Sequence, residues 1–260
     1  MSSTSPLLPY TPISPTSTGD LNHFINIITD AFSETALTTA FIADIDGTKP
    51  PYPSPSIDSA RRFRHFSQGI LDSAASNAEL VQAGNWSVIA LWEPPTYVGK
   101  AFIDSRTRPG ELLAEWREKV KAAKARCLGL ASSKTSIASD SPSPESEDTR
   151  PEVEFEPGPQ LRPFYHLSFL ARNPSAPRVE GSINAVMTPF LERARAENVP
   201  AWLEATTRQA VRVYEHFGFR VVEGIVVGQG KVDAGGWPTQ DGSGEGVTAW
   251  AMIFDGHLRD

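Results

Sequence analysis

The order of strand and helix patterns in the second half of the chain constrains the fold more than any other feature. Short apolar runs alternate there with segments whose apolar residues recur every three or four positions. The predicted strands are 163–171, 199–207, 220–227 and 247–254, and the predicted helices are 181–197 and 209–219. Strands that alternate in this way with helices favour an α/β fold, in which a mixed sheet carries helices on both faces.

The first half of the chain adds helices and a strand pair to this arrangement. The predicted helices are 21–33, 57–75 and 109–128, and the predicted strands are 79–84 and 86–92. Asp20 is a good capping residue for the first helix, and Gly129 ends the third. Residues 1–19 are rich in Ser, Thr and Pro, so we expect them to form a disordered tail.

Acidic residues are concentrated in one segment, 131–160. The segment holds seven acidic and two basic residues, so it carries −5 of the chain's net charge of −7. Ser and Pro are also frequent in this segment, so it is too poor in apolar groups to pack, and we expect a disordered linker. The rest of the chain is nearly neutral and has no basic stripe, which argues against nucleic acid as a partner.

The cysteine content and the absence of long apolar runs indicate a cytoplasmic protein. Cys127 is the single cysteine, so no intramolecular disulfide can form. No apolar run approaches the roughly 20 residues that a membrane-spanning helix needs. The N-terminus lacks the positive region of a secretory signal. Because the histidines have no metal-ligand spacing, we also expect no metal site.

Residues 169–187, FLARNPSAPRVEGSINAVM, run from a strand through a loop into a helix. The start of a helix presents unpaired N–H groups and the positive end of the helix dipole, so it can bind a pyrophosphate. Gly181 would let a ligand approach the backbone closely, and Arg178 could add positive charge. An ordinary strand-to-helix connection with a glycine at its bend explains the same pattern, and the pattern alone favours that simpler interpretation.

Residues 202–219, WLEATTRQAVRVYEHFGF, hold two further candidates for chemistry. Tyr214 lies on the apolar face of the predicted helix, where it could be only a core aromatic whose hydroxyl needs a partner. Glu204 points the same way as Trp202 on the predicted strand. A carboxylate on a central strand is unusual unless it is paired or functional, although a strand end in water would also explain it.

Taken together, these two stretches resemble the GNAT family of acyl-CoA-dependent N-acetyltransferases. Residues 178–183, RVEGSI, are similar to the family's R/Q-x-x-G-x-G/A loop, and the strand that ends LSFLARNP resembles its splayed central strand. Residues 207–219 resemble the signature N-x-x-A-x-x-x-Y-x-x-x-G-F. ALWEPP, at 90–95, is similar to a strand ending seen in many members. The resemblance covers 163–227 and is absent over 100–160.

The resemblance implies a single GNAT domain over 20–260. Its sheet would be mixed and mostly antiparallel, and a helix with an acidic linker would be inserted at about 100–160. It implies acetyl-CoA as co-substrate and a small-molecule primary amine as acceptor. The residues implied for coenzyme A are Leu170, Ala171, Arg172, Arg178, Val179, Glu180, Gly181, Ser182, Ile183 and Thr207. Ile183 and Thr207 depart from the family pattern, which has Gly or Ala at the first position and Asn at the second.

The family mechanism, as the resemblance implies it, is direct transfer in a ternary complex. Tyr214 would protonate the departing thiolate, and a backbone N–H near Leu170 would polarise the carbonyl. Glu204 is the first candidate for the general base and His166 the second. The alternative is a non-catalytic GNAT-fold protein that binds acyl-CoA or serves as an interaction module. The departures at Ile183 and Thr207 favour that alternative.

Overall fold

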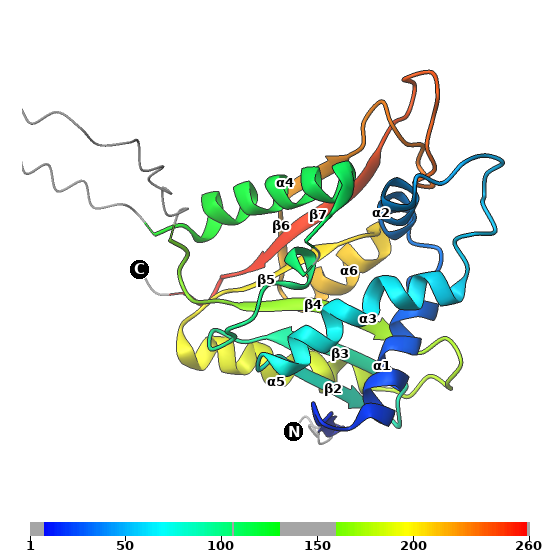
Figure 1. Ribbon diagram of the computed structural model, residues 1–260. Coiled ribbons are helices and arrows are strands. Elements are labelled where there is room, and N and C mark those ends of the chain that lie inside the picture. Colours follow the sequence, from blue (N-terminus) through cyan, green and yellow to red (C-terminus); the bar gives the residue numbers. More distant parts are fainter. Residues whose placement is uncertain (1–7, 106, 131–159, 259–260) are drawn as a thin grey trace, which may run out of the picture.

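The computed structural model describes residues 8–105, 107–130 and 160–258, which form a seven-stranded sheet (Figure 1). The strand order across the sheet is β1-β2-β3-β4-β5-β7-β6. The strands are β1 (Tyr10–Pro12), β2 (Glu79–Ala83), β3 (Val88–Glu93), β4 (Tyr165–Arg172), β5 (Ala201–Ala205), β6 (Arg220–Val227) and β7 (Val247–Phe254). Neighbouring strands are antiparallel, except that β4 and β5 are parallel. The predicted fold class, a mostly antiparallel mixed sheet with helices, is confirmed.

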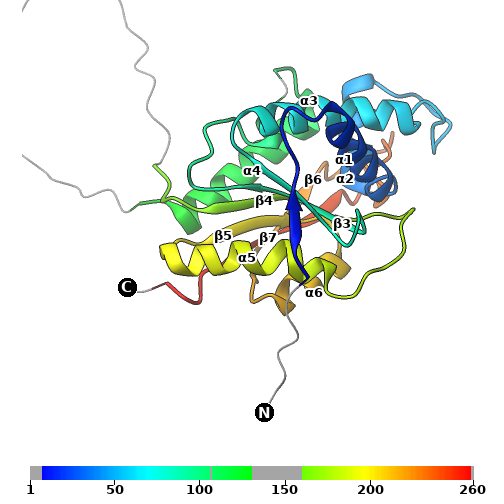
Figure 2. The same cartoon turned by 90° about the horizontal axis from the view of Figure 1, so that it is seen from below.

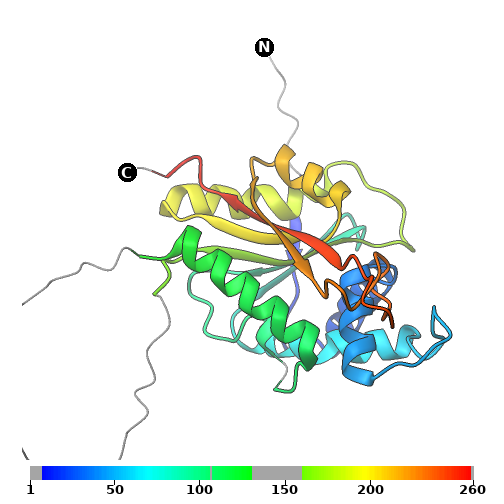
Figure 3. The same cartoon turned by 90° about the horizontal axis from the view of Figure 1, so that it is seen from above.

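Helices cover both faces of this sheet. They are α1 (Thr18–Ala31), α2 (Ala36–Asp46), α3 (Ser59–Ala75), α4 (Gly110–Leu128), α5 (Ser182–Glu197) and α6 (Arg208–His216). Helices α5 and α6 lie together on one face (Figure 2). On the other face, α1 and α3 pack against β2, β3 and β4, while α2 and α4 pack against β5, β6 and β7 (Figure 3). The core is therefore two apolar layers with the sheet between them.

Strands β4 and β5 part near the middle of the sheet. Their parallel ladder ends at the pair Leu167 and Leu203, and beyond it β4 continues to Arg172 alongside β3 only. The β3–β4 register also shifts there: Leu91 pairs with Phe169 and Trp92 with Leu167, so Ser168 is the extra residue of a β-bulge. The sheet therefore opens between β4 and the segment that follows β5.

Two elements near the N-terminus differ from the sequence predictions. The predicted disordered tail is wrong for its described part, because Tyr10–Pro12 form β1 and pair with β2, and α1 begins at Thr18. Ser17, not Asp20, is the residue that precedes α1. Helix α2 was not predicted at all. The acidic linker expected over 131–160 lies outside the described residues except at Gln160, whose carbonyl accepts a hydrogen bond from Leu130 N at 2.9 Å.

Across the described ranges, no helix has both the length and the apolar character that crossing a bilayer requires.

Candidate functional site

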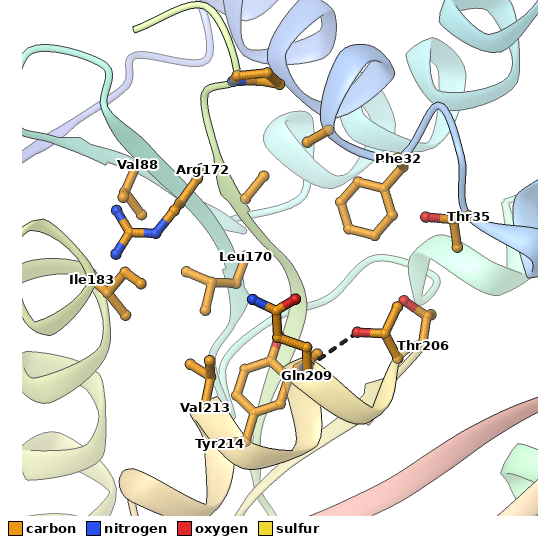
Figure 4. A pocket seen from close by; sticks show the side chains of 15 residues that line it. Phe32, Thr35, Val88, Leu170, Arg172, Ile183, Thr206, Gln209, Val213 and Tyr214 are labelled. Atoms are coloured by element: carbon orange, nitrogen blue, oxygen red, sulfur yellow. Dashed lines mark hydrogen bonds between the residues drawn. The ribbon is translucent and has the colours of Figure 1, made fainter. Parts of the chain in front are cut away.

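A groove lies where β4 and β5 part. It consists of two adjoining pockets of about 420 and 510 Å³, which share Arg172, Ile183, Gln209 and Val213 in their walls. Figure 4 shows the first pocket, with Phe32 at one end and Arg172 and Ile183 at the other. Because the second pocket adjoins the Arg172 end, the groove runs from the start of α5 to the loop between α1 and α2.

The edge of β4 forms one wall of the groove. Leu170, Ala171 and Arg172 all line the first pocket. Their strand pairs with β3 on one side, and β5 has already diverged on the other. A strand offers backbone N–H and C=O groups along both edges, so the edge that faces the groove is free to bond a ligand. These three residues, which the sequence analysis predicts to bind the cofactor, thus lie in one wall of the groove.

Tyr214 reaches the groove from α6. Its ring is packed in the core beside Phe219, at 6.0 Å between ring centroids, and the side chain also lines the first pocket. Within the described part of the chain, its hydroxyl has no hydrogen-bond partner. Burial raises the pKa of Tyr214, so the phenol stays protonated at neutral pH. The hydroxyl is thus a proton donor whose bonding capacity the protein leaves open.

The second pocket lies at the start of α5. Gly181 precedes the helix with a φ of +77°, a conformation that glycine adopts readily. The first N–H groups of α5 have no partner within the helix. Arg172, Arg212 and His216 line this pocket, and Glu180 is the acid among its lining residues. The arrangement combines a helix start with an excess of basic side chains, which suits an anionic ligand.

Three other predicted cofactor residues are placed differently from the rest. Arg178 is exposed and lines neither pocket. Ser182 is fully buried, and its hydroxyl donates to the Val179 carbonyl at 2.7 Å, so it stabilises the loop instead of facing the groove. Thr207 lines the first pocket, but its hydroxyl accepts from Ala210 N at 3.0 Å and so caps α6.

A buried charge network lies beside the groove, on the face of the sheet that α4 covers. His166 Nδ1 is 2.8 Å from Glu93 Oε2, and His166 Nε2 is 3.0 Å from Glu204 Oε2. The His166 and Glu204 side chains are 4% and 8% exposed, so water screens them little. Both predicted base residues are therefore brought together, each bonded to the other. Glu204 precedes Thr206, a groove residue, by two positions, a separation of roughly 7 Å along a strand.

Further groups fix the Glu204 carboxylate. Trp202 Nε1 donates to Glu204 Oε1 at 2.5 Å, and Lys124 Nζ lies 3.6 Å from the same oxygen. Burial would raise the pKa of Glu204, but the charges of Lys124 and His166 and the hydrogen bonds from His166 and Trp202 lower it to about 2. A carboxylate with so low a pKa is a weak proton acceptor at neutral pH. The geometry therefore argues against Glu204 as the base.

His166 has the opposite character. Burial and the charge of Lys124 lower its pKa, but the carboxylates of Glu204 and Glu93 outweigh them and hold the pKa above its usual value. One edge of the ring faces a small cavity of about 170 Å³ that is lined by Tyr97 and Phe164 among others. The Ser168 hydroxyl, at the bulge, donates to Glu93 Oε1 at 2.8 Å. The ring is thus held by β3, β4 and β5 together.

Sequence reasoning missed Glu93 and Lys124. Glu93 was noticed only as part of ALWEPP, and its contact with His166 joins residues 73 apart in the chain. A signal did exist for Lys124, since Val120, Lys124 and Leu128 recur every fourth residue and all face the sheet. A lysine inside an apolar stripe indicates a buried partner, because lysine is rarely buried unpaired.

We predict that Glu204 makes the stability of the protein depend on pH in the acid range. Its pKa is lowered from 4.5 to about 2 in the folded state, so its contribution is complete above pH 4.5 and disappears as the pH falls toward 2. The shift corresponds to roughly 3 kcal/mol. Urea unfolding of the parent and of Glu204→Gln at pH 6, 4 and 2.5 measures it. The two proteins should differ most at pH 6; a constant difference would contradict the prediction.

Across the described residues, no group of three or more His, Cys, Asp or Glu side chains is arranged to hold a metal ion.

The comparisons with known proteins bear mainly on the fold. No family model matches the chain. In sequence it is 33% identical over 91 residues to increased recombination centers protein 11 of Saccharomyces cerevisiae, covering 35% of this chain and 57% of that protein. An uncharacterised protein of the same yeast is 35% identical over 91 residues, with 35% and 38% covered. The chain therefore matches less than two thirds of the length of each of these relatives.

Solved structures match over nearly the whole chain. The C-terminal condensation domain of Ebony, solved with beta-alanyl-dopamine, is 12% identical with a TM-score of 0.54, over 95% of this chain and 99% of that one. A polyamine N-acetyltransferase of Drosophila melanogaster is 12% identical with a TM-score of 0.49, over 95% and 98%. The sheet order, the parted parallel strands and the sequence resemblance together identify the fold as that of the GNAT N-acetyltransferases.

Proposed function

We propose that this protein is an acyl-CoA-dependent N-acetyltransferase that moves an acetyl group from acetyl-CoA to a primary amine of a small molecule. One observation carries the proposal: the groove at the parted strands contains a tyrosine hydroxyl, that of Tyr214, that bonds none of the described residues and lies between an end suited to an anion and a free strand edge. This combination provides for the three parts of the co-substrate, namely its phosphates, its amide-rich arm and its thioester.

The residues present fit coenzyme A. The N–H groups at the start of α5, with Arg172 and Arg212, suit the phosphates at one end of the groove. The free edge of β4 from Leu170 to Arg172 suits the amides of the pantetheine arm, which can pair with it as a strand would. The thioester end would then lie toward Tyr214 and Phe32.

The chemistry that acetyl-CoA supplies is an acyl carbonyl already activated as a thioester. The groove holds this carbonyl and the amine side by side, and such proximity lowers the barrier substantially. A free N–H of β4 near Leu170 can donate to the carbonyl oxygen as it gains negative charge. Tyr214 donates its proton to the thiolate sulfur as the C–S bond breaks.

We assign the role of general base to His166 rather than to Glu204, which reverses the order expected from the sequence. The Glu204 carboxylate has a pKa of about 2 and already accepts from Trp202 and His166. His166 lines neither pocket of the groove, so in its neutral form it takes the amine proton through intervening water. Because the pKa of His166 is raised, its neutral fraction, and with it the rate, should increase with pH.

A small amine is the acceptor class that the groove favours. Its far end is lined by Phe32, Thr35 and Thr206, which offer an aromatic face and two hydroxyl groups but no basic side chain. The ligand and activity named for the structural neighbours, beta-alanyl-dopamine and polyamine acetylation, are consistent with this class. A thiol-release assay with acetyl-CoA and a panel of primary amines tests the proposal, and release that no amine stimulates would refute it.

The second candidate function is a non-catalytic protein that binds acyl-CoA. Two observations favour it: the branched side chain of Ile183 lines both pockets where they adjoin, and the two candidate bases are bonded to each other. Calorimetric titration separates the cases. Acetyl-CoA binding without turnover for any amine supports this candidate, whereas binding with turnover supports the enzyme.

We predict that Ile183 limits the affinity for coenzyme A. Its branched side chain lines both pockets at the first turn of α5. Ile183→Gly widens the groove there, and the helix loses up to about 1 kcal/mol. Calorimetry should therefore show tighter binding, while Ile183→Leu, which keeps the volume, should bind like the parent. Equal or weaker binding by Ile183→Gly would mean that the side chain supports the ligand instead of obstructing it.

A further inference from the structure

Helix α4 inserts a lysine into the network around His166. Lys124 lies on the buried face of α4, and its side chain is 8% exposed. The helix belongs to the segment 100–160, whose sequence does not resemble the acetyltransferase motifs. Lysine side chains are seldom buried to this extent unless a carboxylate compensates the charge. Lys124 therefore has a specific partner, and that partner is Glu204.

The contacts of Glu204 divide between its two oxygens. Oε1 faces Lys124 Nζ at 3.6 Å and Trp202 Nε1 at 2.5 Å, while Oε2 faces His166 Nε2 at 3.0 Å. Lys124 Nζ also lies 5.6 Å from the ring centre of Phe164, at the entry to β4. The ammonium thus ties α4 to both strands that part at the groove, and it holds Glu204 in the orientation that meets His166.

The charges of the network balance as a set of four. Glu93 and Glu204 carry two negative charges, and Lys124 with protonated His166 carries two positive ones. Among the described residues, the other charged or titratable groups beside the ring are Arg162 and Tyr97, which line the adjacent small cavity. Without Lys124, the two carboxylates would face His166 with one cation fewer beside them, and the proton of His166 would be held more tightly.

We propose that Lys124 is a positioning residue for acyl transfer: it fixes Glu204 beside His166 and balances the second carboxylate, so that His166 can release and accept a proton. The inference rests on the proposed function for its catalytic consequence. The electrostatic coupling between Lys124 and His166 does not depend on the proposed function, because it follows from the contacts of the charge network. The amine loses one proton to neutral His166, and no group other than these two gains or loses a charge in that step.

NMR titration of the full-length protein tests the coupling directly. The chain has five histidines, and His166→Asn identifies the resonance of His166. Lys124→Met and Lys124→Gln should raise the pKa of His166 by about one unit, because each removes a positive charge. Lys124→Arg keeps the charge and should titrate close to the parent. The same His166 pKa in all four proteins would overturn the proposal. Circular dichroism checks that each variant is folded, and the two neutral variants give independent readings.

Kinetics then separate positioning from general support of the fold. In Lys124→Met and Lys124→Gln, the acidic limb of the pH profile of kcat/KM should move to higher pH, while the KM for acetyl-CoA stays near that of the parent. A uniform loss of activity at every pH, with no movement of the limb, would make Lys124 merely structural and overturn the proposal. If the parent acetylates no amine, the proposed function fails, and the NMR titration still decides whether Lys124 controls the proton affinity of His166.

Discussion

Tyr214→Phe should lower kcat for acetyl transfer by roughly 10²- to 10⁴-fold, the usual contribution of general acid–base catalysis. The substitution removes only the hydroxyl, which lies in the groove wall and has no partner in the described part of the chain. Because the hydroxyl bonds none of the described residues, its loss leaves no orphaned group among them. The ring keeps its place against Phe219, so the groove keeps its shape. Steady-state kinetics with the best amine of the panel measures the effect.

The control for this prediction is binding. Calorimetry should give nearly the same acetyl-CoA affinity for Tyr214→Phe as for the parent, and thermal unfolding should give a similar midpoint. A matched change away from the groove is Tyr165→Phe. It removes a hydroxyl that donates to Glu197 at 2.8 Å. That variant should keep full turnover. A Tyr214→Phe enzyme that turns over like the parent would remove Tyr214 from the mechanism.

Gly181→Asp should weaken coenzyme A binding by about 100-fold or more. The new carboxylate would stand at the start of α5, beside the N–H groups proposed for the phosphates, and two like charges about 5 Å apart repel by roughly 3 kcal/mol in a partly screened site. Space is not the cause, since a Cβ at Gly181 would meet only Leu8 Cβ, at 3.9 Å. Calorimetric titration with coenzyme A measures the loss.

Gly181→Asn is the matched control. It has nearly the shape of Asp, tolerates the same positive φ of +77°, and carries no charge. Any strain of the backbone is therefore common to both variants, and only the charge differs. Gly181→Asn should bind at least ten times more tightly than Gly181→Asp. Equal affinities would mean that the phosphates lie elsewhere.

The parts of the fold that could be predicted from the sequence are those with a regular apolar period. Every predicted strand and helix of the second half forms, because each buries one face in a way that its periodicity records. Helix α2 escaped prediction because Leu37–Ala43 are buried all round, which erases the period. Strand β1 escaped prediction because it has only three residues. It is held by backbone pairing with β2, and backbone pairing leaves no pattern in the side chains of the sequence.

The candidate site was only partly predictable, for a related reason. Gly181, Ile183 and Tyr214 could be found because a local motif marks each of them, and all three lie in the walls of the groove. The charge network could not, because it joins β3, β4, β5 and α4 through side chains far apart in the chain. The order of the two base candidates depended on those partners, since the neighbours of Glu204 determine its pKa.

The parting of β4 and β5 means that the molecule has two half-sheets, β1–β4 and β5–β7, joined by a short parallel seam that ends at Leu167 and Leu203. A ligand that pairs with the free edge of β4 and also touches α6 would link these two halves. Amide hydrogen exchange along Leu170–Arg172 should therefore be slower when the ligand is bound than when it is absent. Because this short seam joins the two halves, a change in their relative angle would change the width of the groove.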